Sequence, residues 1–411
     1  MILLLVSLSG DVSEYDMDSG TPVQELQRRV QALMSRPEYI KLSLAGEILR
    51  PTSTLAESGV EDGSLIAVVR IPMPKYVLTY GDDFTAKLWR SATGDCMYTF
   101  LHNSNVGYAV LSRNGVFVLT CSDDSTAKIW RIDDGVCIQT FRHTLAIYTA
   151  SFSGDGASVL TSSDDNTAKL WNIRNGGCIH TFDHGQEFKK YVTSASFSGD
   201  DAFVLTTCGG DFTAIVWSIA TGARVRTLRH GNTQFNAATF SGDGASVVTA
   251  ADNTLKLWSI TDGACIYTFT HPIGAYVQVL SAVFSGDGVS VLSASSDCTA
   301  KLWSITNGAC IQTFSGHKGS IQSIAFSGDG LSVLTASADH TAKLWSIESG
   351  TCLQTYIGHK APVYTATFSS DGFSVLTAGK DHAAKIWSIE SGECMQSIVR
   401  KGILAAEFSL F

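Results

Sequence analysis

Eight tryptophans recur at nearly constant intervals along the 411 residues of this chain. They are Trp89, Trp130, Trp171, Trp217, Trp258, Trp303, Trp345 and Trp387. The intervals between them are 41, 41, 46, 41, 45, 42 and 42 residues. So regular a period predicts one supersecondary unit that is repeated along the chain, each copy packing against its neighbours.

Each copy carries the same polar residues at fixed distances from its tryptophan. An aspartate precedes the tryptophan by six residues: Asp83, Asp124, Asp165, Asp211, Asp252, Asp297, Asp339 and Asp381. A hydroxyl residue precedes it by nine or ten: Thr79, Thr120, Thr161, Thr207, Thr249, Ser293, Thr335 and Thr377. A histidine opens seven copies: His102, His143, His184, His230, His271, His317 and His359.

The copy that begins at His317 shows the expected secondary structure. It predicts strands at Ile321–Phe326, Ser332–Ala336, Thr341–Ile347 and Cys352–Tyr356. Short runs of β-branched and aromatic residues between Gly and Asp turns are typical of antiparallel all-β structure. One four-stranded sheet cannot bury its own apolar face, so we expect the sheets to pack radially.

These motifs resemble the WD40 family over residues 75–411. The family pattern is present as Gly316-His317 followed by Asp339-His340-Thr341-Ala342-Lys343-Leu344-Trp345, although no tryptophan here is followed by aspartate. The resemblance implies a buried hydrogen-bonded tetrad of His317, Thr335, Asp339 and Trp345. A buried carboxylate needs hydrogen-bond donors, and imidazole and hydroxyl groups supply them. We therefore interpret the tetrad as structural and not catalytic.

The two ends of the repeat region are complementary. The first repeat has only three predicted strands, at Tyr76–Tyr80, Thr85–Trp89 and Met97–Leu101, and Ile403–Ser409 resembles the missing inner strand. We therefore predict an all-β, eight-bladed propeller closed by the C-terminal strand, which removes exposed sheet edges. Arg400-Lys401 replaces the histidine of the closing copy, so we expect an incomplete tetrad there.

The N-terminal segment predicts a small α+β domain. Strands are expected at Met1–Val6, then up to Met17, and at 40–44, 47–49 and 64–70. A helix is expected from Thr21-Pro22. This order resembles the β-grasp fold of the ubiquitin family over residues 1–71, followed by a short proline linker at 72–74 and the propeller at 75–411.

The ubiquitin resemblance also implies a recognition patch, at Leu8, Ser43, Ala67 and Val69. Ser43 and Ala67 replace the isoleucine and the histidine of that patch, so binding to the usual ubiquitin receptors stays open. The chain continues through Ile71-Pro72-Met73-Pro74 without Gly-Gly, so conjugation to a target is not expected.

Composition excludes several function classes. A net charge of −9 argues against nonspecific nucleic-acid binding, and no apolar run approaches the ~18 residues of a membrane span. Seven of the ten cysteines share one repeat position, seven residues after the tryptophan. They are Cys96, Cys137, Cys178, Cys265, Cys310, Cys352 and Cys394. We expect reduced thiols in different blades, and a location in the cytoplasm or the nucleus.

No motif predicts catalysis. The Ser-Gly-Asp-Gly segments at 153, 241, 285 and 327 lead into strands and are interpreted as turns, since a phosphate cradle needs a helix N-terminus. His180 and His184 have no cysteine or carboxylate in a zinc-like arrangement. We predict no enzyme, no cofactor and no metal.

The residues that differ between copies are the candidate partner-binding residues. Resemblance to other propellers directs attention to the position before the tetrad aspartate and to positions at the start of the inner strand. Two insertions, around 187–191 and 273–278, are expected on the same face. The candidates are Asp82, Asp123, Asp164, Tyr148, Lys189, Lys190, Tyr191, Leu280, Tyr364 and Lys380. Aspartates beside tyrosines suit a basic peptide, while the alternative is that the aspartates only cap turns.

The leading hypothesis is a non-enzymatic scaffold that is monomeric on its own. Its propeller would bind a protein or peptide, with basic ones as candidates, and its ubiquitin-like domain would recruit a second partner from the ubiquitin–proteasome machinery. Two alternatives rest on resemblance: a ribosome-assembly factor of the Notchless type, and a cullin-ligase substrate receptor, suggested by Trp171-Asn172-Ile173-Arg174.

Overall fold

The structure is a computed structural model. It describes residues 2–6, 12–16, 18–21, 23, 26, 40–44, 47–49, 54–61, 64–70, 76–185, 191–210, 212–231, 233, 235–272 and 277–409. The chain divides into two compact units, Met1–Met73 and Pro74–Phe411. The predicted linker, 72–74, lies outside the described residues. Within the described ranges, no helix has the length and apolarity to cross a membrane.

The N-terminal unit contains one mixed sheet in the order β2-β1-β5-β3-β4. Its strands are β1 (Ile2–Val6), β2 (Val12–Asp16), β3 (Ile40–Leu44), β4 (Glu47–Ile48) and β5 (Leu65–Arg70). β1 pairs antiparallel with β2 and parallel with β5. Val23 and Leu26 of the predicted helix are helical and fully buried, and the rest of that helix lies outside the described residues. The ubiquitin-like domain is confirmed.

The second unit is made of eight four-stranded antiparallel sheets, the blades. The inner strands are β9 (Val106–Leu111), β13 (Ile147–Phe152), β17 (Val192–Phe197), β21 (Ala237–Phe240), β25 (Val279–Phe284), β29 (Ile321–Phe326), β33 (Val363–Phe368) and β37 (Ile403–Phe408). The second strands are β6 (Tyr76–Gly81), β10 (Phe117–Ser122), β14 (Ser158–Ser163), β18 (Phe203–Cys208), β22 (Ser246–Ala251), β26 (Ser290–Ser295), β30 (Ser332–Ser337) and β34 (Ser374–Gly379). The third strands are β7 (Thr85–Arg90), β11 (Thr126–Arg131), β15 (Thr167–Asn172), β19 (Thr213–Ser218), β23 (Thr254–Ser259), β27 (Thr299–Ser304), β31 (Thr341–Ser346) and β35 (Ala383–Ser388). The outer strands are β8 (Cys96–Leu101), β12 (Cys137–Arg142), β16 (Cys178–Asp183), β20 (Arg224–Arg229), β24 (Cys265–Thr270), β28 (Cys310–Ser315), β32 (Cys352–Ile357) and β36 (Cys394–Val399).

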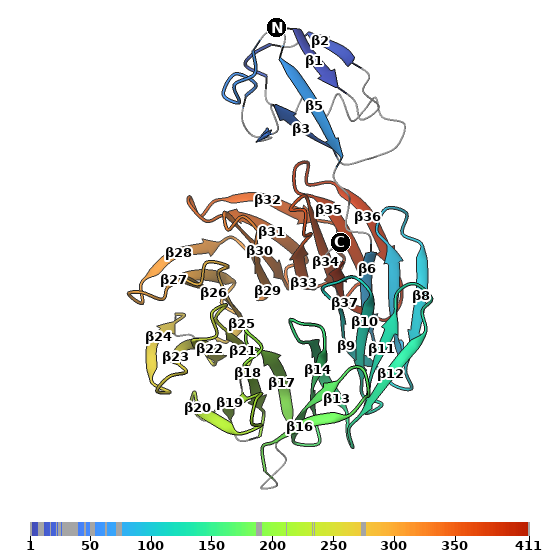
Figure 1. The fold of residues 1–411 in the computed structure, drawn as a ribbon. Helices are drawn as coiled ribbons and strands as arrows, with labels where there is room; N and C mark the ends of the chain where they lie inside the picture. Colours follow the sequence, from blue (N-terminus) through green and yellow to red (C-terminus); the bar gives the residue numbers. More distant parts are fainter. Residues whose placement is uncertain are drawn as a thin grey trace. The chain divides into compact units, whose positions relative to one another are not determined.

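The blades follow one another around a ring, and each inner strand neighbours the next (Figure 1). The closing blade has the order β37-β6-β7-β8 and so joins the C-terminal strand to the first three strands of the repeat region. β37 pairs antiparallel with β6, with Ile403 opposite Gly81 and Phe408 opposite Val77. The predicted eight-bladed propeller closed by its C-terminal strand is confirmed.

The core of the propeller lies between the blades. Each pair of neighbouring blades shares its own apolar cluster. Between the β25–β28 and β29–β32 blades, for example, Phe314 of the outer strand contacts Trp345 of the next blade, with ring centroids 6.0 Å apart. Both side chains are almost fully buried. The repeated tryptophan therefore belongs to the interface between two blades and not to the interior of one sheet.

Contacts near the outer strands also join each blade to the next. The Tyr98 hydroxyl donates to the carbonyl of Asp133 at 2.6 Å, and the Tyr267 hydroxyl donates to the carbonyl of Thr306 at 3.0 Å. The same side chains pack against a turn glycine of the next blade, where a Cβ on Gly135 would lie 2.5 Å from the Tyr98 ring. Gly135 has φ +70°, so both its space and its backbone favour glycine.

Candidate functional site

The predicted tetrad residues lie together in the β29–β32 blade. His317 Nδ1 is 2.7 Å from Asp339 Oδ2, and His317 Nε2 is 2.8 Å from Thr335 Oγ1. The Trp345 indole donates to the same Thr335 hydroxyl at 2.9 Å. The same chain of bonds joins His102 to Asp124, His143 to Asp165, His271 to Asp297 and His359 to Asp381.

The burial of the tetrad histidines favours a structural role over a catalytic one. Burial lowers the pKa of His317 despite the opposing effect of Asp339, so the imidazole is neutral at pH 7. Burial alone would raise the pKa of Asp339. Hydrogen bonds from Thr341, the backbone N–H of Lys318 and His317 more than offset this effect and lower it to about 2. The His317 side chain has no exposed surface, and the Thr335 hydroxyl that it faces already accepts from the Trp345 indole, so a substrate does not reach this histidine.

Two blades depart from the predicted tetrad. In the β17–β20 blade the prediction that Thr207 supplies the tetrad hydroxyl is wrong. His184 and Trp217 both bond to Thr206 instead, at 2.8 and 2.7 Å. In the β21–β24 blade His230 bonds to Thr249 and Thr254 at 2.9 and 2.8 Å. There the tetrad aspartate, Asp252, accepts from Thr233 at 2.9 Å.

The closing blade replaces its missing histidine with a lysine. Lys87 is buried and bonds to both Asp83 and Thr85 at 2.5 Å, so this aspartate has a cationic donor where the β29–β32 tetrad has a neutral imidazole. The Trp89 indole donates to Thr79 at 2.7 Å, as in the complete tetrads. The closing tetrad therefore lacks its histidine, as expected, and Lys87 takes over the bond to the aspartate.

A cation lies over most of the repeated tryptophans, including those in the blades whose tetrads differ from the repeat. In five blades the lysine two residues before the tryptophan lies 5.5 to 6.0 Å from its ring centroid. Where Ile215 replaces that lysine, Arg224 lies 5.1 Å from Trp217. Where Lys87 bonds to Asp83 instead, Arg400 lies 5.7 Å from Trp89. Such cation–π contacts contribute about 0.5–1 kcal/mol each at exposed sites.

Replacing Lys87 by methionine is expected to destabilise the protein by about 1–3 kcal/mol, because Asp83 and Thr85 would lose a charged donor. Lys343→Met is the matched control, since Lys343 occupies the same repeat position over Trp345 but is only half-buried. Thermal unfolding of both variants measures the difference. Equal losses of stability would contradict the assigned role of Lys87.

Four of the predicted binding residues converge on the face that carries the tetrad turns, here called the tetrad face. Tyr148 at the start of β13 donates to Asp164 Oδ1 at 3.3 Å, and its ring lies 6.4 Å from that of Tyr191. Burial and the charge of Asp164 raise the pKa of Tyr148, and the charge of Asp123 on the neighbouring blade adds to this effect. Three consecutive blades contribute these side chains, named the acidic–aromatic cluster.

Two residues that support this cluster were missed in the sequence. The Asn105 amide donates to Asp123 Oδ2 at 3.3 Å. The Tyr191 ring lies over Gly209, where a Cβ would come within 2.1 Å of it. Asn105 stands in its blade where Tyr191 stands in the β17–β20 blade, so the same positional rule would have found it.

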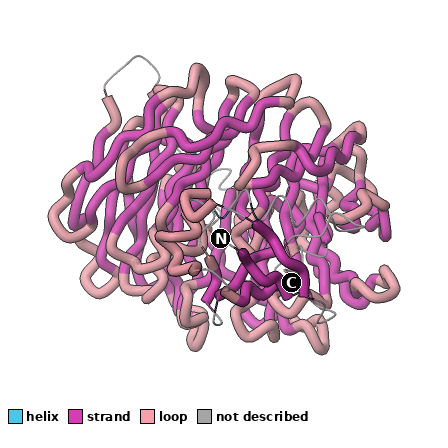
Figure 2. Tube along the Cα trace, turned by 90° about the horizontal axis from the view of Figure 1, so that it is seen from above, coloured by secondary structure: helices cyan, strands magenta, loops and turns pink. Residues whose placement is uncertain are grey.

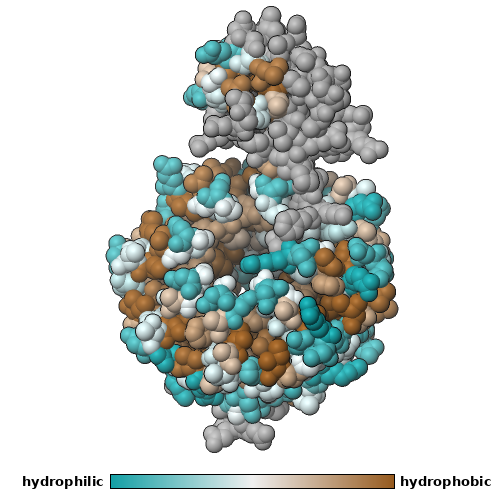
Figure 3. Space-filling model, viewed as in Figure 1, coloured by the Kyte–Doolittle hydropathy of each residue, from teal (hydrophilic) through white to brown (hydrophobic). Residues whose placement is uncertain are grey.

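The remaining candidates are placed around the ring. Asp82 and Lys380 are exposed, and Leu280 and Tyr364 are half-buried. Lys189 and Lys190 lie outside the described residues, as does 273–276 of the second insertion. Figure 3 shows hydrophobic and hydrophilic residues interspersed over the propeller surface turned to the viewer. Within the acidic–aromatic cluster, a hydrogen bond and a ring contact join Tyr148 to Asp164 and Tyr191, and Asp123 acts on Tyr148 through its charge.

The ubiquitin-like patch is only partly described. Ser43 is 4% exposed, while Ala67, opposite it on β5, is exposed. Leu8 lies outside the described residues, and of Val69 only the backbone is described. The adjacent Leu65 is 56% exposed. The described surface of β5 thus presents Leu65 and Ala67.

A closed ring of eight sheets with His–Ser/Thr–Asp–Trp tetrads defines a β-propeller of the repeat type. The family model "WD domain, G-beta repeat" matches residues 94–131, 135–172, 176–218, 222–259, 263–304, 308–346 and 350–388. These segments make up more than half of the chain. The protein belongs to the WD40 repeat family, and the ubiquitin family model matches its residues 2–72.

Known proteins resemble parts of this chain. It is 30% identical over 112 residues to periodic tryptophan protein 2 of Arabidopsis thaliana, covering 27% of this chain and 12% of that protein. It is 36% identical over 86 residues to eukaryotic translation initiation factor 3 subunit I of Meyerozyma guilliermondii, covering 21% and 24%. The crystal structure of the computationally designed Ika8 protein matches with a TM-score of 0.68 and 28% identity, covering 78% of this chain and 95% of Ika8.

Proposed function

We propose that this protein is a non-enzymatic scaffold whose propeller binds a basic segment of a partner protein at the acidic–aromatic cluster. A WD40 propeller joined to a ubiquitin-like domain fits a protein-interaction scaffold, and WD40 families are generally non-enzymatic. The observation that carries the proposal is the convergence of Asp123, Asp164, Tyr148 and Tyr191 from three blades.

The chemistry of the cluster suits arginine and lysine side chains. Asp123 and Asp164 supply carboxylates beside the ring of Tyr148, which is 37% exposed. A guanidinium that pairs with a carboxylate and stacks on a tyrosine face gains both an ion pair and a cation–π contact. Because Tyr148 and Asp164 already bond to each other, the site is partly preorganised for its ligand.

The ubiquitin-like domain would recruit a second partner, and we propose the ubiquitin–proteasome machinery as its source. We place the protein in the cytoplasm or the nucleus, because its ten cysteines are all free thiols and free thiols are typical of reducing compartments. Purification of the protein from cells identifies its partners. If the protein co-sediments with ribosome precursors, this would instead support the ribosome-assembly alternative.

Binding of labelled Arg/Lys-rich peptides to the full chain tests the tetrad-face site. Asp123→Asn with Asp164→Asn is expected to weaken binding roughly tenfold, and added salt should weaken wild-type binding, because exposed ion pairs are screened. Asp287→Asn with Asp329→Asn, in two turns on the opposite face, is the charge-matched control. If the double variant and the control bind these peptides equally well, the proposed site is wrong.

A further inference from the structure

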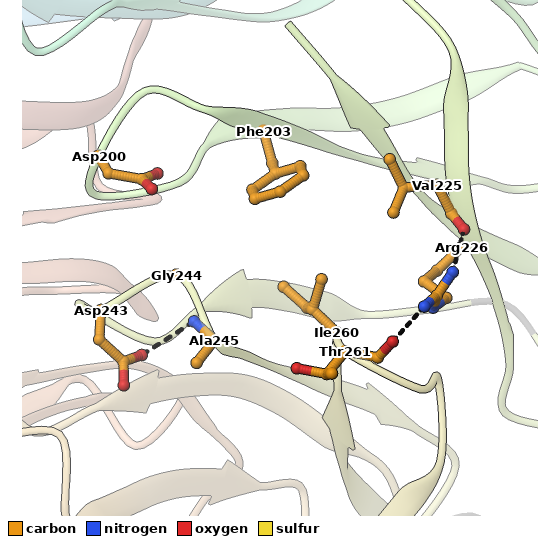
Figure 4. A pocket seen from close by; sticks show the side chains of 9 residues that line it. All are labelled: Asp200, Phe203, Val225, Arg226, Asp243, Gly244, Ala245, Ile260 and Thr261. Carbon is orange, nitrogen blue, oxygen red and sulfur yellow. Dashed lines mark hydrogen bonds between the residues drawn. The ribbon is translucent and has the colours of Figure 1, made fainter.

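A pocket of about 350 Å³ opens between the β17–β20 and β21–β24 blades. It is lined by Asp200, Phe203, Val225, Arg226, Asp243, Gly244, Ala245, Ile260 and Thr261 (Figure 4). These residues come from the turns before β18 and β22, from the start of β20 and from the turn after β23. In antiparallel blades those turns lie at the end opposite the tetrad turns. Figure 2 shows loops and turns gathered at the two ends of the strands. The pocket is therefore separate from the acidic–aromatic cluster.

The pocket has three chemically distinct parts. Asp200 and Asp243 lie at one end, Phe203 and Ile260 lie on its two sides in the middle, and Arg226 lies at the other end (Figure 4). The Arg226 guanidinium donates to the carbonyls of Val225 and Thr261. Its Nε–H is buried and has no hydrogen-bond partner among the described residues. A buried donor without a partner is costly, and a ligand acceptor would satisfy it.

The carboxylates of Asp200 and Asp243 form the acceptor end of the pocket. Asp243 Oδ1 accepts from the Ser241 hydroxyl at 2.6 Å and from the Ala245 N–H at 3.0 Å. Asp200 Oδ1 accepts from Ser198 and Ala202 in the same way. These hydrogen bonds lower the pKa of both groups, so both are ionised at neutral pH. No described residue hydrogen-bonds to either Oδ2, so these two oxygens can accept from a cation.

Two of the residues that line this pocket, Phe203 and Arg226, are departures from the repeat, whereas the two aspartates occupy turn positions that recur in other blades. Most other blades have serine at the position of Phe203: Ser158, Ser246, Ser290, Ser332 and Ser374. At the position of Arg226 the others have Tyr98, Gln139, His180, Tyr267, Gln312, Gln354 and Gln396. Only the β17–β20 blade combines phenylalanine with arginine at these two positions. An apolar wall and a charged end therefore occur together at this one blade interface.

We propose that this pocket binds a lysine side chain of a partner polypeptide. The ammonium group would lie between the Oδ2 atoms of Asp200 and Asp243, and the four-carbon stem would pack on Phe203 and Ile260. The lysine's own backbone carbonyl would then accept from the Arg226 Nε–H, which the side chain must first turn toward the ligand because this atom is buried in the unliganded structure. A lysine residue has these three parts in this order: a cationic end, an apolar stem and a carbonyl. The inference does not depend on the proposed tetrad-face site.

Titration of the full chain with N-acetyl-lysine methylamide, followed by ligand-observed NMR, tests the pocket. We expect binding in the millimolar range, because a ligand this small has few atoms with which to gain affinity. The Nε-acetylated compound, which lacks the charge, should not bind. n-Hexylamine has the ammonium and the stem but no carbonyl, and it should bind more weakly. If it binds as tightly as the lysine compound, the ligand is a free amine and the lysine assignment is wrong.

The chain itself supplies fold-compatible variants. Asp243→Asn removes the charge but keeps the turn, because Asn114 makes the same two bonds in the β9–β12 blade. Phe203→Ser restores the common residue of the repeat. Each change should weaken binding roughly fivefold, whereas Asp287→Asn, at the same turn position in another blade, should not. Equal affinity in Asp243→Asn and Asp287→Asn would overturn the proposal. That outcome would not bear on peptide binding at the tetrad face, which is measured separately.

Discussion

Replacing Gly81 by alanine is expected to disrupt the closure of the ring. A Cβ at Gly81 would lie 1.6 Å from the carbonyl oxygen of Gly402, the residue just before β37. This oxygen cannot move freely, since it accepts from the Asp82 N–H at 3.2 Å and is followed by the Ile403–Gly81 pair. Overpacking usually costs about 1–3 kcal/mol and more where backbone must shift. We expect a loss at or above the top of that range.

Thermal unfolding measured by circular dichroism, with limited proteolysis of β37, tests this prediction. Gly107→Ala is the matched control, because Gly107 lies on the neighbouring inner strand β9 and its Cβ would meet its nearest atom at 4.0 Å. That substitution should change stability by no more than about 0.5 kcal/mol. Equal melting temperatures for the two variants would contradict the close approach at the closure.

The architecture could be predicted from the sequence because the repeat period records it directly. Each tryptophan marks one sheet, and the strand ends expected around His317 lie within one residue of those observed. The closing strand was predictable for the same reason, since the first repeat lacks an inner strand and residues 403–409 resemble one. Periodicity is a property of the whole chain, so errors in single residues do not affect it.

Tetrad residues assigned by their distance in sequence from the tryptophan were wrong where a turn changed length. Thr206 replaces Thr207 in its tetrad because the β18–β19 hairpin is one residue longer: Thr206 pairs with Ile215, nine residues on. In the β29–β32 blade, Thr335 pairs with Lys343, eight residues on. Counting back from the tryptophan assumes that this turn has the same length in every blade. The sequence shows that a copy is longer, but not in which turn or strand the extra residue lies.

Side-chain direction was the second limit. The sequence shows that the closing copy lacks a histidine, but not that Lys87 turns inward to Asp83 while Arg400 takes its place over the tryptophan. The acidic–aromatic cluster was predictable because family positions had been assigned to a common face. The pocket beside Phe203 was not, since Asp243 and Ile260 come from the next blade and only packing brings them together.

Replacing Glu407 by glutamine is expected to stabilise the protein, and increasingly so as the pH rises. Glu407 lies on the closing strand opposite Leu78, beside Tyr80 and Tyr108, and no described residue hydrogen-bonds to its carboxyl group. Burial raises its pKa from the ordinary glutamate value of about 4.5 to about 8. The folded state therefore holds a proton that the unfolded state releases, so this group's contribution to stability falls between about pH 4.5 and 8.

The size of this pH effect on stability follows from the difference between the pKa of Glu407 in the folded and the unfolded state. Each pKa unit corresponds to about 1.36 kcal/mol, so the wild type should lose at most about 5 kcal/mol of stability across this window. Glutamine cannot ionise and should lack this loss. Unfolding by urea at pH 5 and pH 9 should show near-equal stability of the two proteins at pH 5 and a more stable variant at pH 9. Glu348→Gln, an exposed turn residue, is the control, and a Glu407→Gln advantage that does not grow with pH would show that the carboxyl group is ionised throughout.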